Sequence, residues 1–274
     1  MSAVNNAATR IAIVGAGGRM GRMLVETILN TASTQLVAGI DVQGSEIIGK
    51  DAGLLAGFET IGIKVTDDMH AIDGADAVID FTIPTATAAL APIAAKYGVA
   101  HIIGTTGLNP EQTVAVHSVS NIIPVVWAPN FSAGITLLRH LTRLVSSTLD
   151  EAFDIEVVEM HHKHKIDAPS GTALGLGQAA AVGRNVSLDT HGVFERHGQI
   201  GERDKGTIGF ATLRGGDVIG DHTVMFAGPN ERIELTHKAQ NRNVFASGAV
   251  RAATWAKTQT AGLYDMTNVL GISL

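Results

Sequence analysis

The chain has 274 residues, of which 45% are hydrophobic and 4% aromatic, and its formal net charge is −6. This length suits one large or two modest domains with a sizeable core. The negative charge argues against a nucleic-acid partner, and no uncharged apolar run is long enough to cross a membrane. Residues 1–9 contain no apolar signal core, so we expect a disordered lead-in there. The absence of cysteine excludes disulfides and thiolate metal sites and fits a cytoplasmic location.

The first apolar run of the chain leads into a glycine-rich turn. Residues 10–15 lack polar alternation, as expected for a strand buried on both faces, and the pattern of residues 23–28 is helical. Strand, glycine-rich turn and helix in this order are typical of a dinucleotide-binding fold, in which backbone amides approach a pyrophosphate. The residues that we expect to bind the coenzyme in this turn are Gly15, Ala16, Gly17, Gly18, Arg19, Met20 and Gly21. The spacing is not the strict G-x-G-x-x-G, because Met20 stands in the third glycine position, so a turn without a ligand is the alternative.

A second strand, residues 35–40, ends at Asp41. A carboxylate at this place accepts hydrogen bonds from the ribose hydroxyls of a dinucleotide. Val42 follows, so no adjacent arginine is available for a 2′-phosphate. We therefore expect the coenzyme to be NADH, in preference to NADPH.

Further strand and helix patterns alternate up to residue 131. Strands are expected at 75–81, 99–103 and 122–127, and helices at 85–97, after Pro84, and at 109–118. This order predicts a Rossmann-type, doubly wound parallel sheet of the α/β class. The loops 104–107 and 128–131 leave the carboxyl ends of strands, where such sheets bind their ligands. Residues 44–61 are loop-like and predict no defined element.

The pattern changes after residue 131 and predicts an α+β domain. A long helix at 133–149 precedes an alternating strand at 153–160, and residues 188–204 are polar and loop-rich. Three strand-like runs follow at 206–214, 217–227 and 231–239. The turn signals between them predict an antiparallel meander. We expect a last helix at 244–257 and the tail 263–270 to return to the first domain.

The most concentrated chemistry lies in the five residues His161, His162, Lys163, His164 and Lys165, which can all carry positive charge. A basic cluster in an acidic chain indicates a local anion site. Ser170 is a suitable N-cap for a helix over residues 173–181, and free N–H groups at a helix start bind carboxylate or phosphate oxygens. Together these features predict a pocket for a small dianion.

Two other interpretations of the cluster stay open. A run of histidine and lysine is often a solvated loop. Metal binding by His162 and His164 is the second alternative, but the two lysines would repel a cation and no H-E-x-x-H pattern accompanies them. We expect no metal.

From Ile11 to about Leu270 the chain resembles the 4-hydroxy-tetrahydrodipicolinate reductases (dihydrodipicolinate reductases) of bacterial lysine and diaminopimelate biosynthesis. The most specific part is Glu159-Met-His-His-Lys-His-Lys165 with Asp167-Ala-Pro-Ser-Gly-Thr-Ala173, whereas the glycine turn is shared with many dehydrogenases. Further matching motifs are Asp80-Phe-Thr82, Gly104-Thr-Thr-Gly107, Asn130-Phe-Ser132, Gly206-Thr-Ile-Gly-Phe210, Glu231-Arg-Ile-Glu-Leu-Thr-His237 and Leu263-Tyr-Asp-Met266.

The resemblance implies a dinucleotide-binding domain of residues 1–131 and 241–274, and a substrate-binding and tetramerisation domain of residues 132–240 that builds a homotetramer. It implies an NAD(P)H-dependent reduction of 4-hydroxy-tetrahydrodipicolinate to tetrahydrodipicolinate, with domain closure near residues 131 and 240.

The resemblance also implies roles for individual residues. His161 would be the general acid, Lys165 would donate a proton, and His162 with the amides of Gly171 and Thr172 would bind the dicarboxylate. The implied contacts with the nicotinamide end of the coenzyme are Gly104, Thr105, Thr106, Ala128, Pro129, Asn130 and Phe131. The family usually has an arginine after the acidic residue at position 41, and Val42 departs from that pattern.

Two alternative functions share the glycine turn. An amino-acid or homoserine-type dehydrogenase would not need the double histidine followed by Ser-Gly-Thr, and a panel of substrates would separate the two. A non-catalytic NAD(H)-sensing protein would not need an acid–lysine pair, and a turnover assay would identify it.

Overall fold

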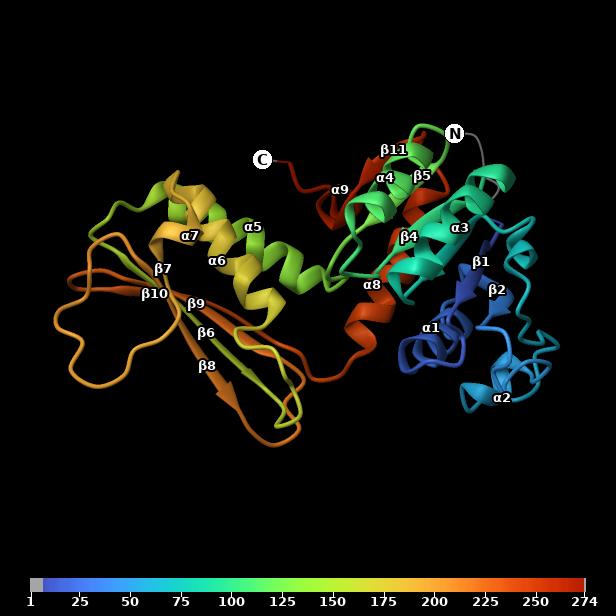
Figure 1. Cartoon of the computed structure of the whole chain (residues 1–274), viewed down its shortest axis with the longest axis horizontal. Coiled ribbons are helices and arrows are strands. Elements are labelled where there is room, and N and C mark those ends of the chain that lie inside the picture. The colour runs from blue at the N-terminus through green and yellow to red at the C-terminus, as the bar shows by residue number, and fades with distance from the viewer. Residues whose placement is uncertain (1–6, 274) are drawn as a thin grey trace. The chain divides into compact units, whose positions relative to one another are not determined.

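The computed structural model describes residues 7–273, and the chain forms two compact units (Figure 1). Unit 1 comprises residues 1–132 and 243–274, and unit 2 comprises residues 133–242. Among the described residues, no helix is long and apolar enough to cross a membrane. Of the expected lead-in, residues 1–6 lie outside the described part, and the expectation is wrong at Thr9, which begins the first strand because its N–H is bonded to Ser33 O.

Unit 1 contains a parallel sheet of six strands in the order β2-β1-β3-β4-β5-β11. The strands are β1 (Thr9–Val14), β2 (Thr34–Ile40), β3 (Ala77–Asp80), β4 (Ala100–Ile103), β5 (Pro124–Trp127) and β11 (Gly262–Tyr264). This arrangement confirms the predicted Rossmann-type sheet. The order reverses between β1 and β3, and such a switch point is where open parallel sheets bind ligands, at the carboxyl ends of the strands.

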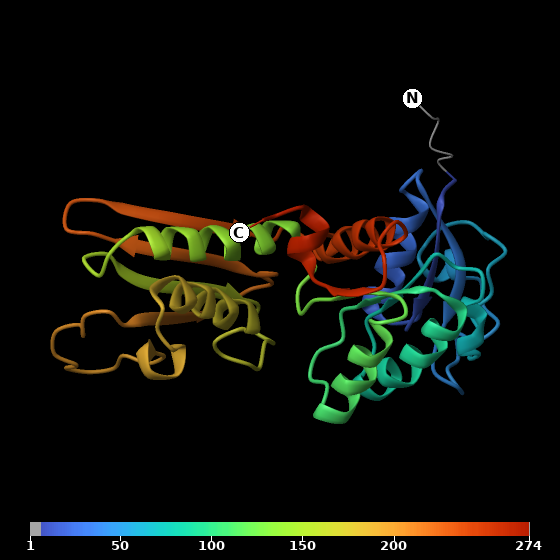
Figure 2. The same ribbon diagram turned by 90° about the horizontal axis from the view of Figure 1, so that it is seen from above.

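Helices cover both faces of this sheet. One face packs against α1 (Arg19–Leu29), α8 (Asn243–Ala256) and α9 (Met266–Leu270), and α8 lies beside α1 (Figure 2). The other face packs against α3 (Pro84–Tyr97) and α4 (Pro110–Val119). Residues 11–14 of β1 therefore enter the two cores alternately, which explains why all four are apolar. The last helix and the tail return to this unit as predicted, since β11 pairs with β5.

The segment 44–61, for which the sequence predicts no element, contains the short helix α2 (Ala52–Leu55). The carboxylate of Asp51 caps this helix by accepting from the N–H groups of Gly53 and Leu54. It also accepts from the N–H groups of Ile61 and Gly62, ten and eleven residues further on. One carboxylate thus orders both ends of the loop. The short helix η1 (Met69–Ile72) follows it.

Unit 2 contains a mixed sheet in the order β10-β9-β6-β8-β7. Its strands are β6 (Asp154–His161), β7 (Gly192–Val193), β8 (Ile208–Arg214), β9 (Asp221–Ala227) and β10 (Arg232–Lys238). The helices are α5 (Ala133–Thr148), α6 (Gly171–Arg184) and α7 (Leu188–His191); α5 and α6 lie on one face of the sheet (Figure 1). The core between sheet and helices includes Val157, Leu176, Phe210 and Phe226. This is the predicted α+β fold.

The predicted antiparallel meander is wrong for its first pair of strands. β9 and β10 form an antiparallel hairpin, but β8 does not pair with β9, because β6 lies between them, parallel to β8 and antiparallel to β9. Residues 215–220 cross the end of β6 and bond to it there: Gly215 N–H donates to His161 O, and His162 N–H donates to Val218 O. The turn signal is real, but the turn spans a strand from an earlier part of the chain.

Candidate active site

The glycine turn opens at the carboxyl end of β1. Gly15 has φ +81°, and Gly18, the N-cap of α1, offers no side chain to cap the helix. A Cβ on Gly21 would lie 2.0 Å from Gly15 O, so only glycine lets α1 pack this closely on the turn. Gly21 thus does what the third glycine of the fingerprint does, displaced by one residue. Of the predicted residues, Arg19, Met20 and Gly21 lie in the first turn of α1, whose N–H groups suit an anion.

Asp41 lies beside this turn. Its Oδ2 accepts from Gly17 N–H at 2.8 Å, and its Oδ1 accepts from Val42 N–H at 2.8 Å. Each oxygen keeps a second lone pair for another donor. The side chain of Val42 is 73% exposed, and Arg19 and Lys50 are exposed as well.

The loops after β3, β4 and β5 meet at the same edge of the sheet. Thr82 N–H donates to Thr105 Oγ1 at 3.1 Å, and Trp127 Nε1 donates to Thr105 O at 3.3 Å. A Cβ on Gly15 would lie 3.0 Å from Thr82 Cγ2, which brings the glycine turn to these loops. The ring of Phe131 packs on that of Phe81, with centroids 5.4 Å apart.

Not all of the predicted loop residues present side chains at this edge. Thr105 and Ala128 are buried, so a ligand would meet their backbone, and Asn130 Oδ1 accepts from Ser132 N–H. Thr106 and Pro129 are exposed, and Gly104 is half-buried against the ring of Phe81.

A buried carboxylate, to which the sequence reasoning gave no role, joins two of these loops. Asp80, fully buried at the end of β3, accepts from the hydroxyls of Thr82 and Thr105 at 2.5 and 3.3 Å, and from His101 Nε2 at 3.3 Å. Burial alone would raise the pKa of Asp80, but the hydrogen bonds from His101 and Thr82 outweigh it and lower the pKa. The charged group holds Thr82 against Thr105. The sequence feature that could have indicated this role is the position of Asp80 at the end of an apolar strand, two residues before a threonine.

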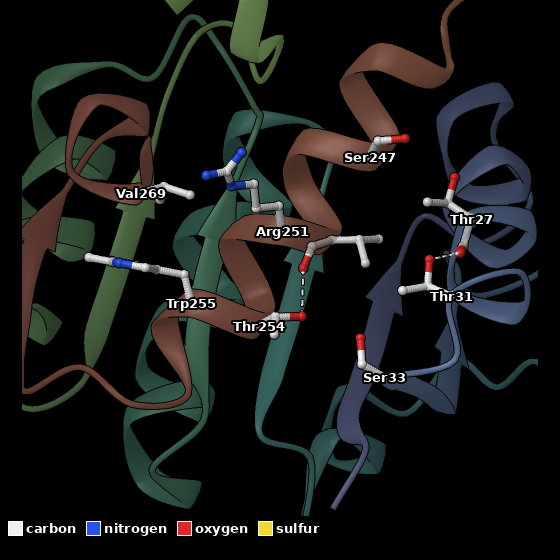
Figure 3. A pocket seen from close by; sticks show the side chains of 9 residues that line it. Thr27, Thr31, Ser33, Ser247, Arg251, Thr254, Trp255 and Val269 are labelled. Atoms are coloured by element: carbon white, nitrogen blue, oxygen red, sulfur yellow. Dashed lines mark hydrogen bonds between the residues drawn. The ribbon is translucent and has the colours of Figure 1, made fainter. Parts of the chain in front are cut away.

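A groove of about 420 Å³ in unit 1 lies at the other end of the sheet (Figure 3). It runs between the last turns of α1, the residue Ser33 before β2, and Arg251 and Trp255 of α8. Thr31 and Thr254 bond to carbonyls of their own helices. Because dinucleotides bind at the carboxyl ends of the strands, this groove is not the coenzyme site.

In unit 2 the basic cluster divides into two environments. β6 extends one residue further than predicted, to His161, and its alternation buries Glu159 and His161 on the face toward the helices. Lys163 and His164 are exposed, so the solvated-loop interpretation holds for these two alone. Within residues 7–273, no group of histidine, aspartate and glutamate is arranged to hold a metal ion.

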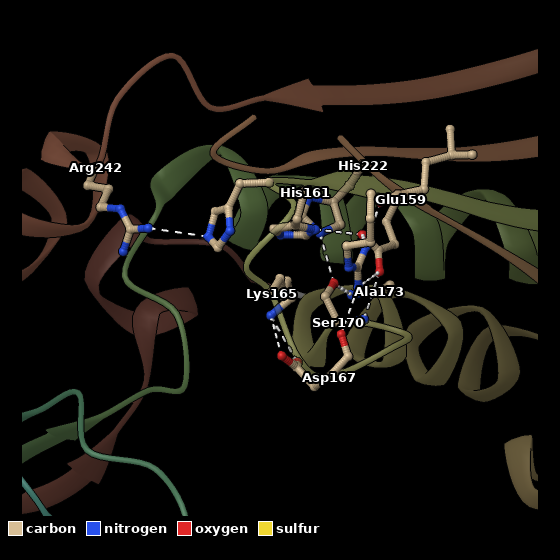
Figure 4. A network of polar contacts seen from close by, with 11 residues as sticks. Glu159, His161, Lys165, Asp167, Ser170, Ala173, His222 and Arg242 are labelled. Atoms are coloured by element: carbon tan, nitrogen blue, oxygen red, sulfur yellow. Dashed lines mark hydrogen bonds and ion pairs between the residues drawn. The ribbon is translucent and has the colours of Figure 1, made fainter. Parts of the chain in front are cut away.

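Glu159 gathers four donors (Figure 4). Oε2 accepts from His161 Nδ1 at 2.5 Å and from Arg214 at 2.9 Å, while Oε1 accepts from Ser170 N–H at 3.0 Å and again from Arg214 at 2.9 Å. Burial alone would raise the pKa of Glu159, but the hydrogen bonds from Arg214, His161 and Ser170 outweigh it and lower the pKa. The carboxylate is therefore charged. The sequence offered a signal here, since positions 159 and 161 of a strand share a face.

His222, on β9, packs edge-on against His161 with ring centroids 5.1 Å apart. Its Nε2 bonds to Ser170 Oγ at 3.1 Å, and its buried Nδ1 has no hydrogen-bond partner among the described residues. Burial lowers the pKa of His222 to about 4, and the charge of His161 adds to the effect. His222 is thus a neutral support for Ser170, whose Oγ caps α6 by accepting from Ala173 N–H, as predicted.

His162 faces a different partner, Arg242, which donates from Nη2 to His162 Nε2 at 3.5 Å. A guanidinium can only donate, so Nε2 is the acceptor and the proton of the neutral imidazole is on Nδ1. Partial burial lowers the pKa of His162, and the charge of Arg242 lowers it further. The Nδ1–H donor is buried and has no partner among the described residues. No motif or spacing in the sequence indicates Arg242 as a site residue.

Lys165 is paired with a carboxylate two residues away. Its Nζ donates to Asp167 Oδ1 at 2.7 Å and to Oδ2 at 2.9 Å. The pKa of Asp167 is lowered mainly by this bond, and the backbone N–H of Gly171, at the start of α6, contributes as well. Lys165 and the backbone N–H of Gly171, the first residue of α6, therefore already act on one carboxylate.

A Rossmann-type sheet with a glycine turn, joined to an α+β unit in which a strand ends in cationic and acid groups, defines a two-domain, dinucleotide-dependent oxidoreductase. Comparison with known families identifies the kind. The family model "Dihydrodipicolinate reductase, N-terminus" matches residues 9–131, and "Dihydrodipicolinate reductase, C-terminus" matches residues 134–270. The chain belongs to the dihydrodipicolinate reductase family.

Individual relatives agree with this assignment. The chain is 52% identical over 265 residues to the 4-hydroxy-tetrahydrodipicolinate reductase of Rhodopseudomonas palustris (strain BisB5), covering 96% of this chain and 98% of that protein. It is 52% identical over 264 residues to the enzyme of that name from Afipia carboxidovorans, covering 96% and 97%. Among solved structures, the dipicolinate-bound dihydrodipicolinate reductase from Paenisporosarcina sp. TG-14 matches with a TM-score of 0.77 at 25% identity, covering 97% of this chain and 100% of that one.

The depressed pKa of His222 predicts a pH-dependent stability. Its folded-state pKa of about 4 lies below the unfolded value of 6.5, so the unfolded chain binds more protons between these values. The free energy of unfolding should therefore fall as pH decreases from about 6.5 to 4, by on the order of 2–4 kcal/mol from this group. His222→Asn should weaken that dependence in urea unfolding at pH 5 and 7. A His222 imidazole that titrates near pH 6.5 by NMR, like an exposed histidine, would contradict the assignment.

Proposed function

We propose that the chain reduces 4-hydroxy-tetrahydrodipicolinate with NAD(P)H to tetrahydrodipicolinate, NAD(P)⁺ and water, in diaminopimelate and lysine biosynthesis. Membership of the dihydrodipicolinate reductase family supports the reaction class. The single observation that carries the chemistry is the imidazole of His161, held by a buried carboxylate next to a lysine and a helix start that already act on a carboxylate.

The residues of unit 2 supply a proton where the ring nitrogen becomes negative. The substrate first loses its 4-hydroxyl as water, which leaves a conjugated ring imine. When bound, the coenzyme would supply the hydride that ring carbon C4 of this imine accepts. The carboxylate of Glu159 accepts a hydrogen bond from Nδ1–H of His161. The other proton of the imidazolium is on Nε2, which faces away from Glu159, and this is the proton that His161 donates. Lys165 stabilises the same charge as a cation and is the alternative donor of that one proton. His161, once neutral, regains its proton from water because an imidazole titrates near neutral pH.

Two carboxylates on the substrate require two sets of donors. We infer that one binds where Asp167 now lies, between Lys165 and the N–H groups of Gly171 and Thr172. The side chain of Asp167 is 53% exposed and can turn to water when a substrate carboxylate replaces it. The second carboxylate binds the Nδ1–H of His162, with Arg242 fixing that tautomer.

The described residues of unit 1 fit a dinucleotide. The first turn of α1 has backbone N–H groups without a side-chain cap, and Gly17 and Gly21 leave no room for a Cβ beside the turn. These features suit a pyrophosphate. Asp41 has lone pairs left for the ribose hydroxyls, and residues 104–106 and 128–131 lie at the edge where the nicotinamide end binds. We propose that NADH is the preferred coenzyme.

The other functions that the sequence left open receive less support. An NAD(H)-sensing protein has no use for an imidazole held by a buried carboxylate beside a lysine. An amino-acid or homoserine-type dehydrogenase would not share both family matches over residues 9–131 and 134–270. The expected cytoplasmic location rests on the cysteine-free composition and stays a prediction.

The exposed neighbours in the basic cluster provide matched controls for the catalytic assignment. His161→Gln and Lys165→Ala should each lower kcat for 4-hydroxy-tetrahydrodipicolinate by roughly 10²–10⁴-fold, because the transition state loses its acid or its cation. His164→Gln and Lys163→Ala, made at exposed positions, should stay within about twofold of the parent. NADH binding, followed by calorimetry, should change in none of the four. Near-parental turnover in the first two variants would remove both residues from the mechanism.

Coenzyme preference should follow from Asp41 and Val42. The Asp41 carboxylate would stand against the 2′-phosphate of NADPH, and the exposed Val42 offers no compensating charge. A net preference of about 1–2 kcal/mol gives roughly a ten- to thirty-fold higher kcat/KM with NADH. Val42→Arg should improve the use of NADPH selectively, whereas Val42→Gln, of similar reach but uncharged, should not. A parent enzyme that already prefers NADPH, for example by recruiting Arg19 or Lys50, would show that this interpretation is wrong.

We also propose that unit 2 forms the homotetramer through the sheet face opposite α5 and α6. The outward side chains there include Val158, Met160, Leu213 and Met225, and Leu213 is 50% exposed. Such a face is apolar enough to bury a partner sheet.

Light scattering should therefore give four times the chain mass of 28.5 kDa. Leu213→Glu should lower this mass, because it places a charge in the interface. Leu144→Glu is the matched control, since Leu144 on α5 is 51% exposed on the helical side. A parent that is monomeric, or a Leu144 variant that dissociates while the Leu213 variant does not, would rule out this face.

A further inference from the structure

We infer that Glu159 is a positioning residue that sets the tautomer of His161 and holds it in register with the start of α6. This inference rests on the proposed function only in that His161 is taken as the acid. The geometry that carries it is the set of contacts around one buried carboxylate.

Glu159 has no free capacity for substrate. Its side chain is 1% exposed, and its two oxygens already accept four hydrogen bonds. A carboxylate has about four lone-pair sites, so it is saturated. Glu159 therefore acts through other residues.

The two oxygens serve different parts of the site. Oε2 holds the imidazole of His161, and Oε1 holds the backbone N–H of Ser170, the N-cap of α6. Arg214 binds both oxygens and also donates to Asp167 O at 2.7 Å, so it fixes the loop that carries Lys165 and Asp167. A single rigid group thus relates the acid to the helix start that binds the substrate carboxylate (Figure 4).

The bond to Nδ1 decides which nitrogen exchanges a proton. A carboxylate only accepts, so Nδ1 carries hydrogen in both charge states of His161, and the proton that comes and goes is on Nε2. Nε2 lies on the side of Gly220, where an added Cβ would be 2.9 Å away. The absence of a side chain at Gly220 leaves that nitrogen accessible.

Several charged or titratable groups face His161 besides Glu159. They are Arg214 at the end of β8, His222 on β9, and His162 and Lys165 after β6. The cations Arg214 and Lys165 disfavour an imidazolium, whereas His162 and His222, whose pKa values are lowered, are neutral. Glu159 is the one carboxylate among the described groups bonded to this ring, so its charge stabilises the imidazolium of His161.

The test is Glu159→Gln, which preserves shape and removes charge. We expect kcat/KM to fall by about 10²-fold or more, and the pH at which kcat/KM declines on the alkaline side to move down by about one unit, because the imidazolium loses its counter-charge. Glu159→Asp should restore most of the parental pH profile. Glu151→Gln, in the exposed turn before β6 and paired with Lys205, is the control and should keep both the rate and the profile of the parent. A Glu159→Gln enzyme with reduced kcat but the parental pH profile would show that Glu159 is merely structural.

A second measurement needs no variant and covers the case in which Glu159→Gln does not fold. Long-range ¹⁵N NMR of the parent above its alkaline limb should show neutral His161 with hydrogen on Nδ1. Hydrogen on Nε2 instead would overturn the inference. If the parent fails to reduce 4-hydroxy-tetrahydrodipicolinate, the proposed function is wrong, whereas the tautomer measurement still judges the role of Glu159.

Discussion

The geometry of unit 2 depends on a carboxylate that is charged, buried and fully satisfied. Removing an ion from water costs several kcal/mol, which only a bidentate partner and further donors can offset. Glu159 obtains these from Arg214 on β8, His161 on its own strand and the backbone at the start of α6. Because all four hydrogen bonds are needed to satisfy this buried carboxylate, β6, β8 and the start of α6 cannot shift independently of one another. The same saturation explains why β8 lies beside β6: the parallel register places Arg214 opposite His161, within reach of Glu159.

In unit 1 the governing constraint is that both faces of the sheet are covered. Strands that are apolar throughout leave only their ends for polar chemistry, and parallel strands bring the ends of β1, β3 and β4 to one edge. Asp80 exploits this arrangement. Fully buried at the end of β3, it holds the backbone and hydroxyl of Thr82 and the hydroxyl of Thr105 in place. The backbone of the loops after β3 and β4, where we propose that the nicotinamide end of the coenzyme binds, is thereby held by buried side chains.

How far the sequence could predict this protein depended on how local each signal is. The glycine turn, the cap Ser170 and the alternation of β6 are encoded within a few residues, and the structure agrees with them. The strand neighbour of β8 is not local: turn residues predict that the chain reverses, but not that β6 stands between the two strands. His222 contacts Ser170 across 52 residues, so no spacing rule could find it. Glu159 lies two residues from His161 on the same face of β6, so the strand periodicity alone could have predicted that the two side chains are neighbours.

The pairing of Lys165 with Asp167 affects how a measured affinity for a dicarboxylate should be interpreted. A dicarboxylate that enters under the proposed mechanism exchanges with a carboxylate of the chain, so its binding free energy is the difference between two ion pairs. Water already reaches Asp167, so releasing it costs little. The internal pair also compensates the charge of Lys165 while no substrate is bound. Under the proposed mechanism, an anion that binds only one of these donors has to displace the Asp167 carboxylate, which binds both Lys165 and Gly171, and this disfavours such an anion against a substrate carboxylate.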